Sequence, residues 1–261
     1  MKVLVTGHRG FIGSVVYSLL RSRGLDVYGV DIGDGVDSGR YDYIVHLAAR
    51  TLIRKSIELP FQYYEDNLHL SMQFIERCRN QGSTIIFPTS GSVSEASNPY
   101  SLSKRQTVEW INLYRKLYGI NAYVLKFYNV YGPNSRKGAV YLFLKSAIKN
   151  EPVTIFGDGS HTRDFIHVQD VATAILKIIE GEFKPGDYEM GTGKGTTVNQ
   201  LLRLVEEVSG KKLQVIRKGY IVDEADSLVA SNPMLRETKP LKIGISEIYE
   251  ELSHLDPNLL P

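Results

Sequence analysis

Cysteine is almost absent from the 261-residue sequence, and neither sign of charge dominates. The single cysteine, Cys78, cannot form an intramolecular disulfide, which excludes a disulfide-stapled scaffold and favours a reducing, cytoplasmic location. Lysine and arginine total 31 against 29 aspartates and glutamates, a net charge of +2 with no basic block. We therefore expect a small-molecule partner and no nucleic acid.

Long hydrophobic runs and metal-binding clusters are also missing. No stretch of about 18 apolar residues occurs, and the chain starts with the strand-like run KVLVT and no secretion-signal pattern. We expect neither a membrane partner nor secretion. The six histidines are scattered, with no pair at ligand spacing, so no metal site is expected. His46 and His167 are interpreted as structural residues that form hydrogen bonds at strand ends.

The sequence does contain apolar strands that alternate with helices. Buried strands are expected at 2–6, 27–31, 43–48, 84–88 and 121–127, and helices at about 11–23, 61–79 and 101–118. Continuous apolar strands separated by helices require a parallel sheet covered on both faces. We therefore predict an α/β fold with a doubly wound parallel sheet. Residues 32–42 are too few for a helix plus a strand, so a loop is expected there.

The pattern becomes less regular after residue 133. Helices are expected near 138–149, 168–181 and 197–209, with a glycine-rich loop at 157–160 and a strand near 187–190. We predict that a smaller, discontinuous C-terminal lobe accompanies the sheet. The expected division is a sheet domain, residues 1–133 plus about 161–191, and a small lobe, about 134–160 plus 192–261.

Three glycines, Gly7, Gly10 and Gly13, follow the first strand and open the first helix. Glycine permits a tight turn and lets backbone N–H groups approach a pyrophosphate at the helix N-terminus. Asp31 ends the second strand, where a carboxylate can accept hydrogen bonds from an adenosine ribose and would repel a 2′-phosphate. The combination predicts a dinucleotide-binding loop that prefers NAD. Arg9 leaves open a contact with a 2′-phosphate, although a solvated loop cation is the simpler interpretation.

A tyrosine and a lysine, Tyr100 and Lys104, lie four residues apart at the start of a later helix and so share one helical face. At that spacing the ammonium can lower the pKa of the phenol and make it a usable base. The pattern alone is common by chance. Its place after the hydroxyl-rich strand end at 89–92 (TSGS), in a chain with a dinucleotide loop, favours a catalytic role.

Together these motifs resemble the extended short-chain dehydrogenase/reductase family, in its nucleotide-sugar epimerase and dehydratase branch. The matching segments are TGHRGFIG (6–13), HLAA (46–49), LKFYNVYGP (125–133) and GDGSHTRDFIHVQDVATA (157–174). The resemblance implies a Rossmann sheet domain that binds NAD, a small lobe that binds substrate, and a nucleotide-diphosphate sugar as that substrate. It assigns catalysis to Ser90, Tyr100 and Lys104.

The resemblance also distributes binding roles along the chain. The implied cofactor-binding residues are Gly7, Arg9, Gly10, Phe11, Ile12, Gly13, Asp31, Leu47, Ala48, Ala49, Asn67, Tyr100 and Lys104. The implied substrate-binding residues are Ser90, Ser92, Asn129 and Arg163, the last two at the diphosphate, where the planar arginine fork suits bidentate contact.

The resemblance further implies a homodimer built from the helices at about 61–79 and 101–118. Five apolar residues exceed what one sheet-facing stripe needs and indicate a second hydrophobic face: Phe74, Ile75, Trp110, Ile111 and Leu113.

Departures from the family pattern reduce the number of reactions that the chain is expected to catalyse. Gly91-Ser92 stands where dehydratases carry an Asp-Glu pair, so the acid that expels water is missing. The loops after Asp31 and Ser90 are short, and Arg217 aligns poorly with a second phosphate-binding arginine. We predict NAD-dependent C4 epimerisation, as in UDP-hexose 4-epimerases, through a transient 4-keto intermediate. A nucleotide-sugar reductase or dehydrogenase using NAD(P)H, and a non-catalytic dinucleotide-binding regulator, remain as alternatives.

Overall fold

The computed structural model describes residues 1–35, 39–91, 97–219 and 225–256 of the chain. It divides into two compact units. Unit 1 contains Met1–Phe127 and Val171–Glu189, and unit 2 contains Tyr128–Asp170 and Met190–Pro261. Each unit is described by itself.

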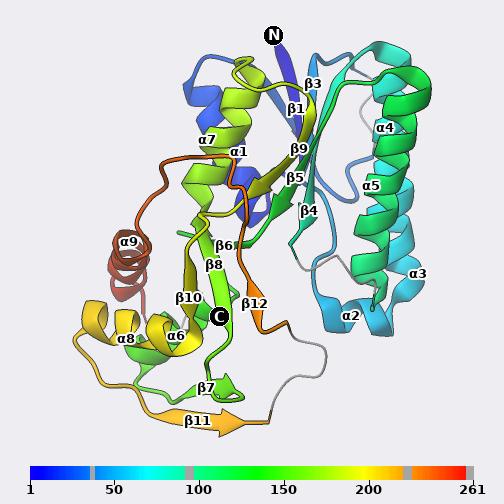
Figure 1. The fold of residues 1–261 in the computed structure, drawn as a ribbon. Coiled ribbons are helices and arrows are strands. Elements are labelled where there is room, and N and C mark those ends of the chain that lie inside the picture. The colour runs from blue at the N-terminus through cyan, green and yellow to red at the C-terminus, as the bar shows by residue number, and fades with distance from the viewer. Residues whose placement is uncertain (36–38, 92–96, 220–224, 257–261) are drawn as a thin grey trace. The chain divides into compact units, whose positions relative to one another are not determined.

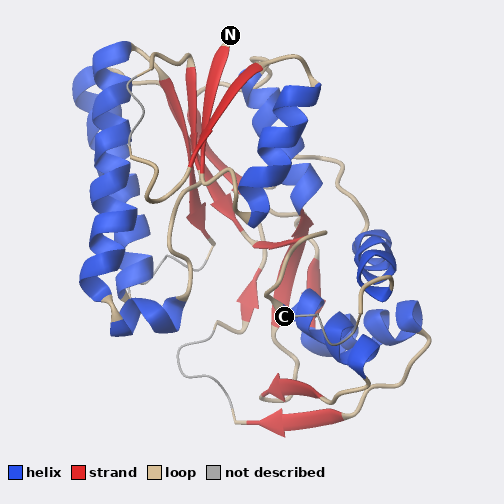
Figure 2. Cartoon of the chain, turned by 180° about the vertical axis from the view of Figure 1, so that it is seen from behind, coloured by secondary structure: helices blue, strands red, loops and turns tan. Residues whose placement is uncertain are grey.

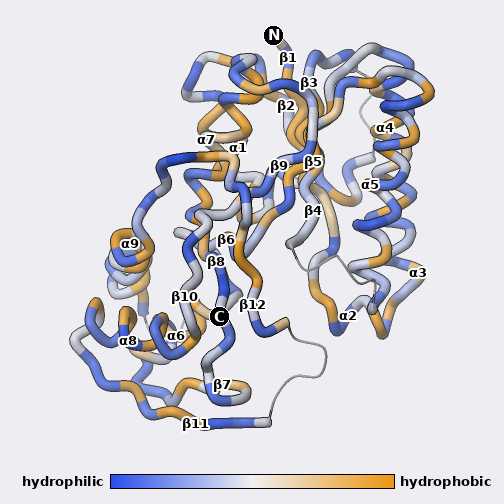
Figure 3. Tube along the Cα trace, in the orientation of Figure 1, coloured by the Kyte–Doolittle hydropathy of each residue, from blue (hydrophilic) through white to orange (hydrophobic). Residues whose placement is uncertain are grey.

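A six-stranded sheet with the order β2-β1-β3-β4-β5-β9 forms the centre of unit 1 (Figure 1). Every pairing from β2 to β5 is parallel, which confirms the predicted doubly wound fold. Val3, Leu4 and Val5 are fully buried because both faces of the sheet are covered. Figure 3 shows hydrophobic residues along these central strands. The strands are β1 (Lys2–Thr6), β2 (Asp26–Val30), β3 (Tyr43–His46), β4 (Thr84–Ser90), β5 (Ala122–Phe127) and β9 (Gly186–Met190).

Helices cover both faces of this sheet, with α1 and α7 on one face and α4 and α5 on the other (Figures 1 and 2). Their bounds are α1 (Phe11–Ser22), α2 (Ile53–Glu58), α3 (Pro60–Tyr63), α4 (Leu70–Gln81), α5 (Pro99–Tyr118) and α7 (Val168–Ile179). The long helices turn an apolar stripe to the strands; Ile111 of α5, for example, is fully buried. The short helices α2 and α3 pack against α5. Between β2 and β3, residues 32–35 and 39–42 form neither helix nor strand, as predicted.

The helix predicted at about 61–79 is not uniform. It consists of α3, a π-helical segment η1 (Tyr64–His69) and α4, which follow one another without a break. A π segment widens the helix by closing its hydrogen bonds one residue further along the chain, a change that hydrophobic periodicity does not reveal. Such segments occur frequently at functional sites.

Unit 2 contains smaller sheets and three helices among its described residues. Its strands are β6 (Asn129–Tyr131), β7 (Val153–Phe156), β8 (Thr162–His167), β10 (Gly195–Thr197), β11 (Val215–Lys218) and β12 (Ser227–Leu228). Its helices are α6 (Ala139–Lys149), α8 (Val198–Ser209) and α9 (Leu241–Ser253), which share a core that includes Leu144, Leu201 and Ile245. Because β8 pairs with β6, residues 161–170 belong to this unit and not, as the sequence suggested, to the sheet domain.

Candidate active site

The glycine loop between β1 and α1 is closed so tightly that two of its positions leave no room for a side chain. Gly7 has a φ of +70°, and a Cβ atom there would lie 2.8 Å from the backbone nitrogen of Ala48. A Cβ atom on Gly13 would lie 2.0 Å from the carbonyl oxygen of Gly7. Glycine is therefore required at both positions for the loop to pass close to the end of β3.

This loop fits the pyrophosphate of a dinucleotide. Gly10 precedes α1 as its N-cap and provides no side-chain hydrogen bond, so the first N–H groups of the helix can meet an anion. The N–H of Gly10 closes the turn on the carbonyl of Gly7 at 3.0 Å. Phe11 and Ile12, at the start of α1, are half-buried. Leu47, Ala48 and Ala49 follow β3, and the backbone of Leu47 and Ala48 lies beside Gly7.

Asp31 lies just after β2 and contacts the glycine loop. Its carboxylate accepts a hydrogen bond from the backbone N–H of Arg9 at 3.1 Å and another from the N–H of Ile32 at 2.9 Å. The Arg9 side chain pairs with Asp34, with 2.8 Å between Nη2 and a carboxylate oxygen. The interpretation of Arg9 as a solvated loop cation is therefore incomplete, because the guanidinium has an acidic partner.

Ser90 and Tyr100 are carried by neighbouring elements of unit 1. Ser90 is the last residue of β4, and its half-buried side chain lies at the carboxyl end of the sheet. Tyr100 lies in the first turn of α5, which begins with a capping box: Asn98 accepts from the N–H of Ser101, and Ser101 Oγ accepts from the N–H of Asn98. The cap fixes where the helix starts and hence where Tyr100 is presented.

Lys104 is buried, with 5% of its surface exposed, and its Nζ donates to the carbonyl oxygen of Pro88 at 3.1 Å. The ammonium also lies 4.6 Å from the centre of the Phe87 ring. Burial lowers the pKa of Lys104 to about 8. In the chain alone, burial of the phenol, assisted by Tyr63, raises the pKa of Tyr100 to about 12.

Asn67 lies in the π segment η1 and connects three parts of unit 1. Its Oδ1 accepts from the N–H of Arg50 at 2.8 Å, and its Nδ2 donates to the Arg50 carbonyl at 3.0 Å and to Ser103 Oγ at 3.2 Å. Ser103 precedes Lys104 on α5. The amide of Asn67 thus joins the chain after β3 to the helix that carries Tyr100 and Lys104.

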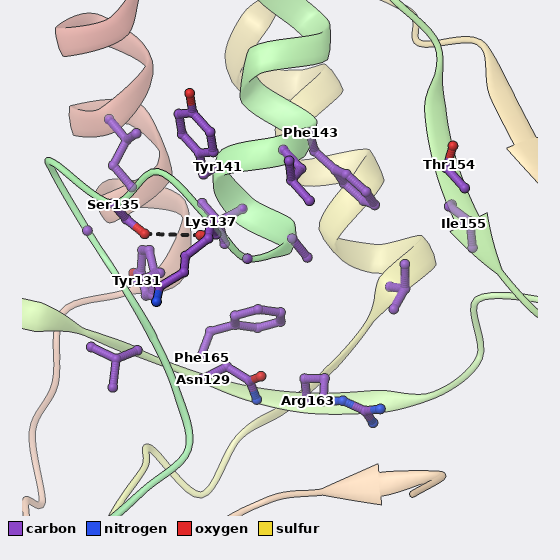
Figure 4. Close-up of a pocket in the computed structure, with 18 of the residues that line it drawn as sticks. Asn129, Tyr131, Ser135, Lys137, Tyr141, Phe143, Thr154, Ile155, Arg163 and Phe165 are labelled. Carbon is purple, nitrogen blue, oxygen red and sulfur yellow. Dashed lines mark hydrogen bonds between the residues drawn. The ribbon is translucent and has the colours of Figure 1, made fainter. Parts of the chain in front are cut away.

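Unit 2 contains a pocket of about 310 Å³ lined by residues of β6, α6, β7 and β8 (Figure 4). Phe143, Ile155 and Phe165 give it apolar walls, and Asn129, Arg163 and Lys137 add polar groups. Asn129 Nδ2 donates to the Asp164 carbonyl at 3.2 Å. Arg163 Nη1 donates to the carbonyls of Thr162 and Ala225, each at 2.9 Å. A pocket with flat apolar walls and cationic side chains suits an aromatic ring attached to phosphate.

The Asp164 carboxylate accepts hydrogen bonds from the segments that follow β9 and β12. Its donors are the hydroxyl of Thr192 at 2.6 Å and the N–H groups of Thr192, Gly193 and Ala230 at 2.8 to 3.1 Å. Arg217 is on β11, where its guanidinium donates to the Gly157 carbonyl at 3.4 Å. The structure thus brings Asn129 and Arg163 into one pocket.

Comparison with known proteins decides the family. Residues 3–191 match the NAD dependent epimerase/dehydratase family. The chain belongs to that family. Similar proteins include the UDP-glucuronate 4-epimerase of Thermodesulfobacterium geofontis, 28% identical over 265 residues that cover 80% of this chain and 81% of the relative.

Two solved structures have the same fold as this chain. The UDP-glucose 4-epimerase of Thermotoga maritima with UDP-glucose has a TM-score of 0.87 at 26% identity and covers 97% of this chain and 98% of its own. The UDP-glucose 4-epimerase of Thermus thermophilus with NAD has a TM-score of 0.82 at 26% identity, with coverage of 97% and 99%. Family membership confirms NAD as the cofactor.

Sequence reasoning missed a buried polar chain that joins the cofactor loop of this epimerase-family protein to Asn67. His46 Nδ1 lies 2.8 Å from Thr6 Oγ1, and His46 Nε2 lies 2.9 Å from Ser71 Oγ. Because Ser71 Oγ donates to the Asn67 carbonyl, it accepts from Nε2, which places the imidazole proton there. Burial lowers the pKa of His46 to about 3. His46 is neutral, and it forms hydrogen bonds as predicted.

Three further predictions concern Ser92, metal binding and membrane-spanning helices. Ser92, a predicted substrate-binding residue, lies outside the described residues. Within residues 1–35, 39–91, 97–219 and 225–256, no group of three or more His, Cys, Asp or Glu side chains is placed to hold a metal ion. In the same described ranges, no helix is both long enough and apolar enough to cross a membrane.

Proposed function

We propose that the protein interconverts the C4 epimers of a nucleotide-diphosphate sugar, with a UDP-hexose as the substrate. One observation supports this most strongly. The cofactor loop, Ser90, Tyr100 and Lys104 all belong to unit 1, and the Lys104–Pro88 hydrogen bond ties the tyrosine helix to the strand that ends at Ser90. The UDP-sugar 4-epimerases among its relatives and structural neighbours support the substrate class.

In this mechanism Tyr100 accepts the proton of the C4 hydroxyl and later returns it. Ser90 forms a hydrogen bond with the same hydroxyl, and the ammonium of Lys104 stabilises the phenolate of Tyr100. The raised pKa of Tyr100 keeps the phenol protonated at neutral pH, so it needs nearby positive charge before it can act as a base. Held by the glycine loop and Asp31, NAD⁺ would supply a reversible hydride acceptor for C4 and a positive charge near the phenol.

We propose that the pocket of unit 2 binds the nucleotide half of the substrate. Arg163 and Asn129 would contact the diphosphate, and the walls formed by Phe143 and Phe165 would hold the base. Strong binding of the nucleotide would leave the sugar free to present either face to the reacting groups, which epimerisation requires.

The functional protein is proposed to be a cytoplasmic homodimer. Phe74, Ile75 and Ile111 cannot form its interface, since they are buried in the core of unit 1. On α5, however, Trp110, Leu113, Leu117 and Tyr118 are between 41% and 57% exposed, and they supply the second hydrophobic face. With a single cysteine the chain cannot form an internal disulfide, which supports a reducing compartment.

A panel of UDP-, GDP-, dTDP- and CDP-sugars, each incubated with the protein and no added cofactor, tests the proposal. We expect NMR to show one nucleotide sugar converted to an equilibrium mixture of C4 epimers. Conversion that required stoichiometric NAD(P)H would instead indicate a reductase. Dinucleotide binding with no turnover of any sugar would indicate a regulator.

A further inference from the structure

The turn after β2 brings two carboxylates to Arg9 of the glycine loop. Asp31 accepts the backbone N–H of Arg9 at 3.1 Å, and its carboxylate lies 3.9 Å from the guanidinium Nε. Asp34 lies closer, because both of its oxygens are 2.8 Å from Nη2 of Arg9. The N–H of Asp31 donates to Asp34 at 2.9 Å and holds that carboxylate in place.

An arginine in a dinucleotide loop is a natural ligand for the 2′-phosphate that distinguishes NADP from NAD. In this chain the guanidinium already has a charged partner. The hydrogen bond from Arg9 lowers the pKa of Asp34, so the carboxylate is ionised at neutral pH. A 2′-phosphate that reached Arg9 would have to displace Asp34 and would approach a second carboxylate at Asp31.

We propose that Asp34 makes the protein selective for NAD over NADP by occupying the guanidinium of Arg9. The inference rests on the proposed function, since it assumes that the glycine loop binds a dinucleotide. Asp31 would favour NAD by accepting a hydrogen bond from its ribose 2′-hydroxyl. Asp34 would disfavour NADP by pairing with the Arg9 guanidinium, which could otherwise bind the 2′-phosphate. Loss of Asp34 alone should therefore release Arg9 and leave the contact with NAD intact.

The expected effect is moderate, because Arg9 and Asp34 are exposed to solvent, with 58% and 37% of their side chains accessible. Two unit charges about 4 Å apart in water interact with an energy equivalent to roughly fivefold in binding. We therefore expect Asp34→Asn to raise the affinity for NADP⁺ at least about fivefold. The affinity for NAD⁺ should change by less than about twofold, because its 2′-hydroxyl is neutral.

The experiment compares the wild type with Asp34→Asn, Asp26→Asn and the double variant Arg9→Ala/Asp34→Asn. Asp26 lies at the start of β2, is exposed, and controls for the change in net charge. Each protein is freed of bound dinucleotide and incubated with equal concentrations of NAD⁺ and NADP⁺. Chromatography of the bound fraction gives their ratio, and calorimetry gives each affinity.

The inference predicts that NADP⁺ binding increases in Asp34→Asn, stays at the wild-type value in Asp26→Asn, and returns towards the wild-type value in the double variant. An unchanged NADP⁺ affinity in Asp34→Asn, an equal gain in Asp26→Asn, or a gain that persists without Arg9 would each overturn it. Those results would leave NAD⁺ binding by the wild type intact. A wild type that binds neither dinucleotide would instead overturn the proposed function itself.

Discussion

Lys104 donates a hydrogen bond of 3.1 Å from its Nζ atom to the carbonyl oxygen of Pro88, two residues before Ser90. The contact fixes α5, which also carries Tyr100, against the strand that ends at the proposed catalytic Ser90. Burial lowers the pKa of this lysine from 10.5 to about 8, so its charge opposes folding at neutral pH. Function and stability therefore conflict at one residue.

Replacement of that lysine, Lys104→Met, is expected to abolish turnover and yet stabilise the fold at pH 7 by up to about 3 kcal/mol, less the cost of removing the donor from the Pro88 carbonyl. Between pH 8 and 10.5 the unfolded chain binds the proton and the folded chain does not, so the free energy of unfolding of the wild type rises with pH. The advantage of the variant should shrink over that range. Urea unfolding at pH 7 and at higher pH measures the difference in the free energy of unfolding between the variant and the wild type. Lys116→Met, at an exposed position of the same helix, is the control. A variant less stable than the wild type at pH 7 would contradict the argument.

Gly13→Ala places a methyl group against the Gly7 carbonyl, at the 2.0 Å separation that a Cβ atom would have. The glycine loop must shift, at a cost of about 1–3 kcal/mol, which corresponds to a loss of roughly 5- to 150-fold in NAD affinity. Measurement of the NAD released on denaturation checks this. Gly219→Ala, at a position with no neighbouring atom within 4 Å, is the matched control. Full NAD content in Gly13→Ala would show that the loop does not bind the dinucleotide.

Arg163→Ala is expected to weaken nucleotide-sugar binding by about 1.5–3 kcal/mol, roughly tenfold to a hundredfold, because a charge-assisted contact with phosphate is lost. The content of bound NAD should not change, since the glycine loop is in unit 1. Calorimetry with a UDP-sugar measures the affinity of the variant and of the wild type. Arg217→Ala, on a different strand, is the control. Unchanged affinity with a lower unfolding temperature would mean that Arg163 only braces the carbonyls of Thr162 and Ala225.

The exposed hydrophobic face of α5 predicts a dimer in solution. Light scattering at micromolar concentration should give twice the chain mass of 29.3 kDa for the wild type. Leu113→Glu combined with Leu117→Glu should give the monomer, because two carboxylates cannot be buried unpaired in an interface. Ile216→Glu, an exposed position on β11, should remain dimeric. A stable wild-type monomer would exclude this interface.

Much of unit 1 could be predicted from the sequence because its elements are long and strongly patterned. The strands predicted at 2–6 and 84–88 contain the apolar runs VLV and IIF, and Gly7 and Gly13 lie where neighbouring backbone leaves no room for a side chain. The short strands of unit 2, such as β6 and β12, depend on partners far along the chain. No local pattern marks them.

The parts of the site that were missed depend on burial and long-range contacts. Periodicity does not distinguish the π segment that holds Asn67 from an ordinary helix. The spacing of Tyr100 and Lys104 was visible, but their pKa values follow from how deeply each is buried. The pairing of Arg9 with Asp34 joins residues 25 positions apart and needs the structure to be seen.

The most direct test of transient oxidation at C4 uses UDP-glucose that carries deuterium at that carbon. If the proton moves through Tyr100 and the hydride leaves and returns within one active site, the UDP-galactose formed in ordinary water keeps its deuterium at C4. Tyr100→Phe should slow this conversion by at least roughly 10²-fold while it still binds the nucleotide sugar. Retention of the label, seen by NMR, is the result that the account predicts. Replacement of the label by solvent hydrogen, or turnover in Tyr100→Phe within a few-fold of the wild type, would contradict it.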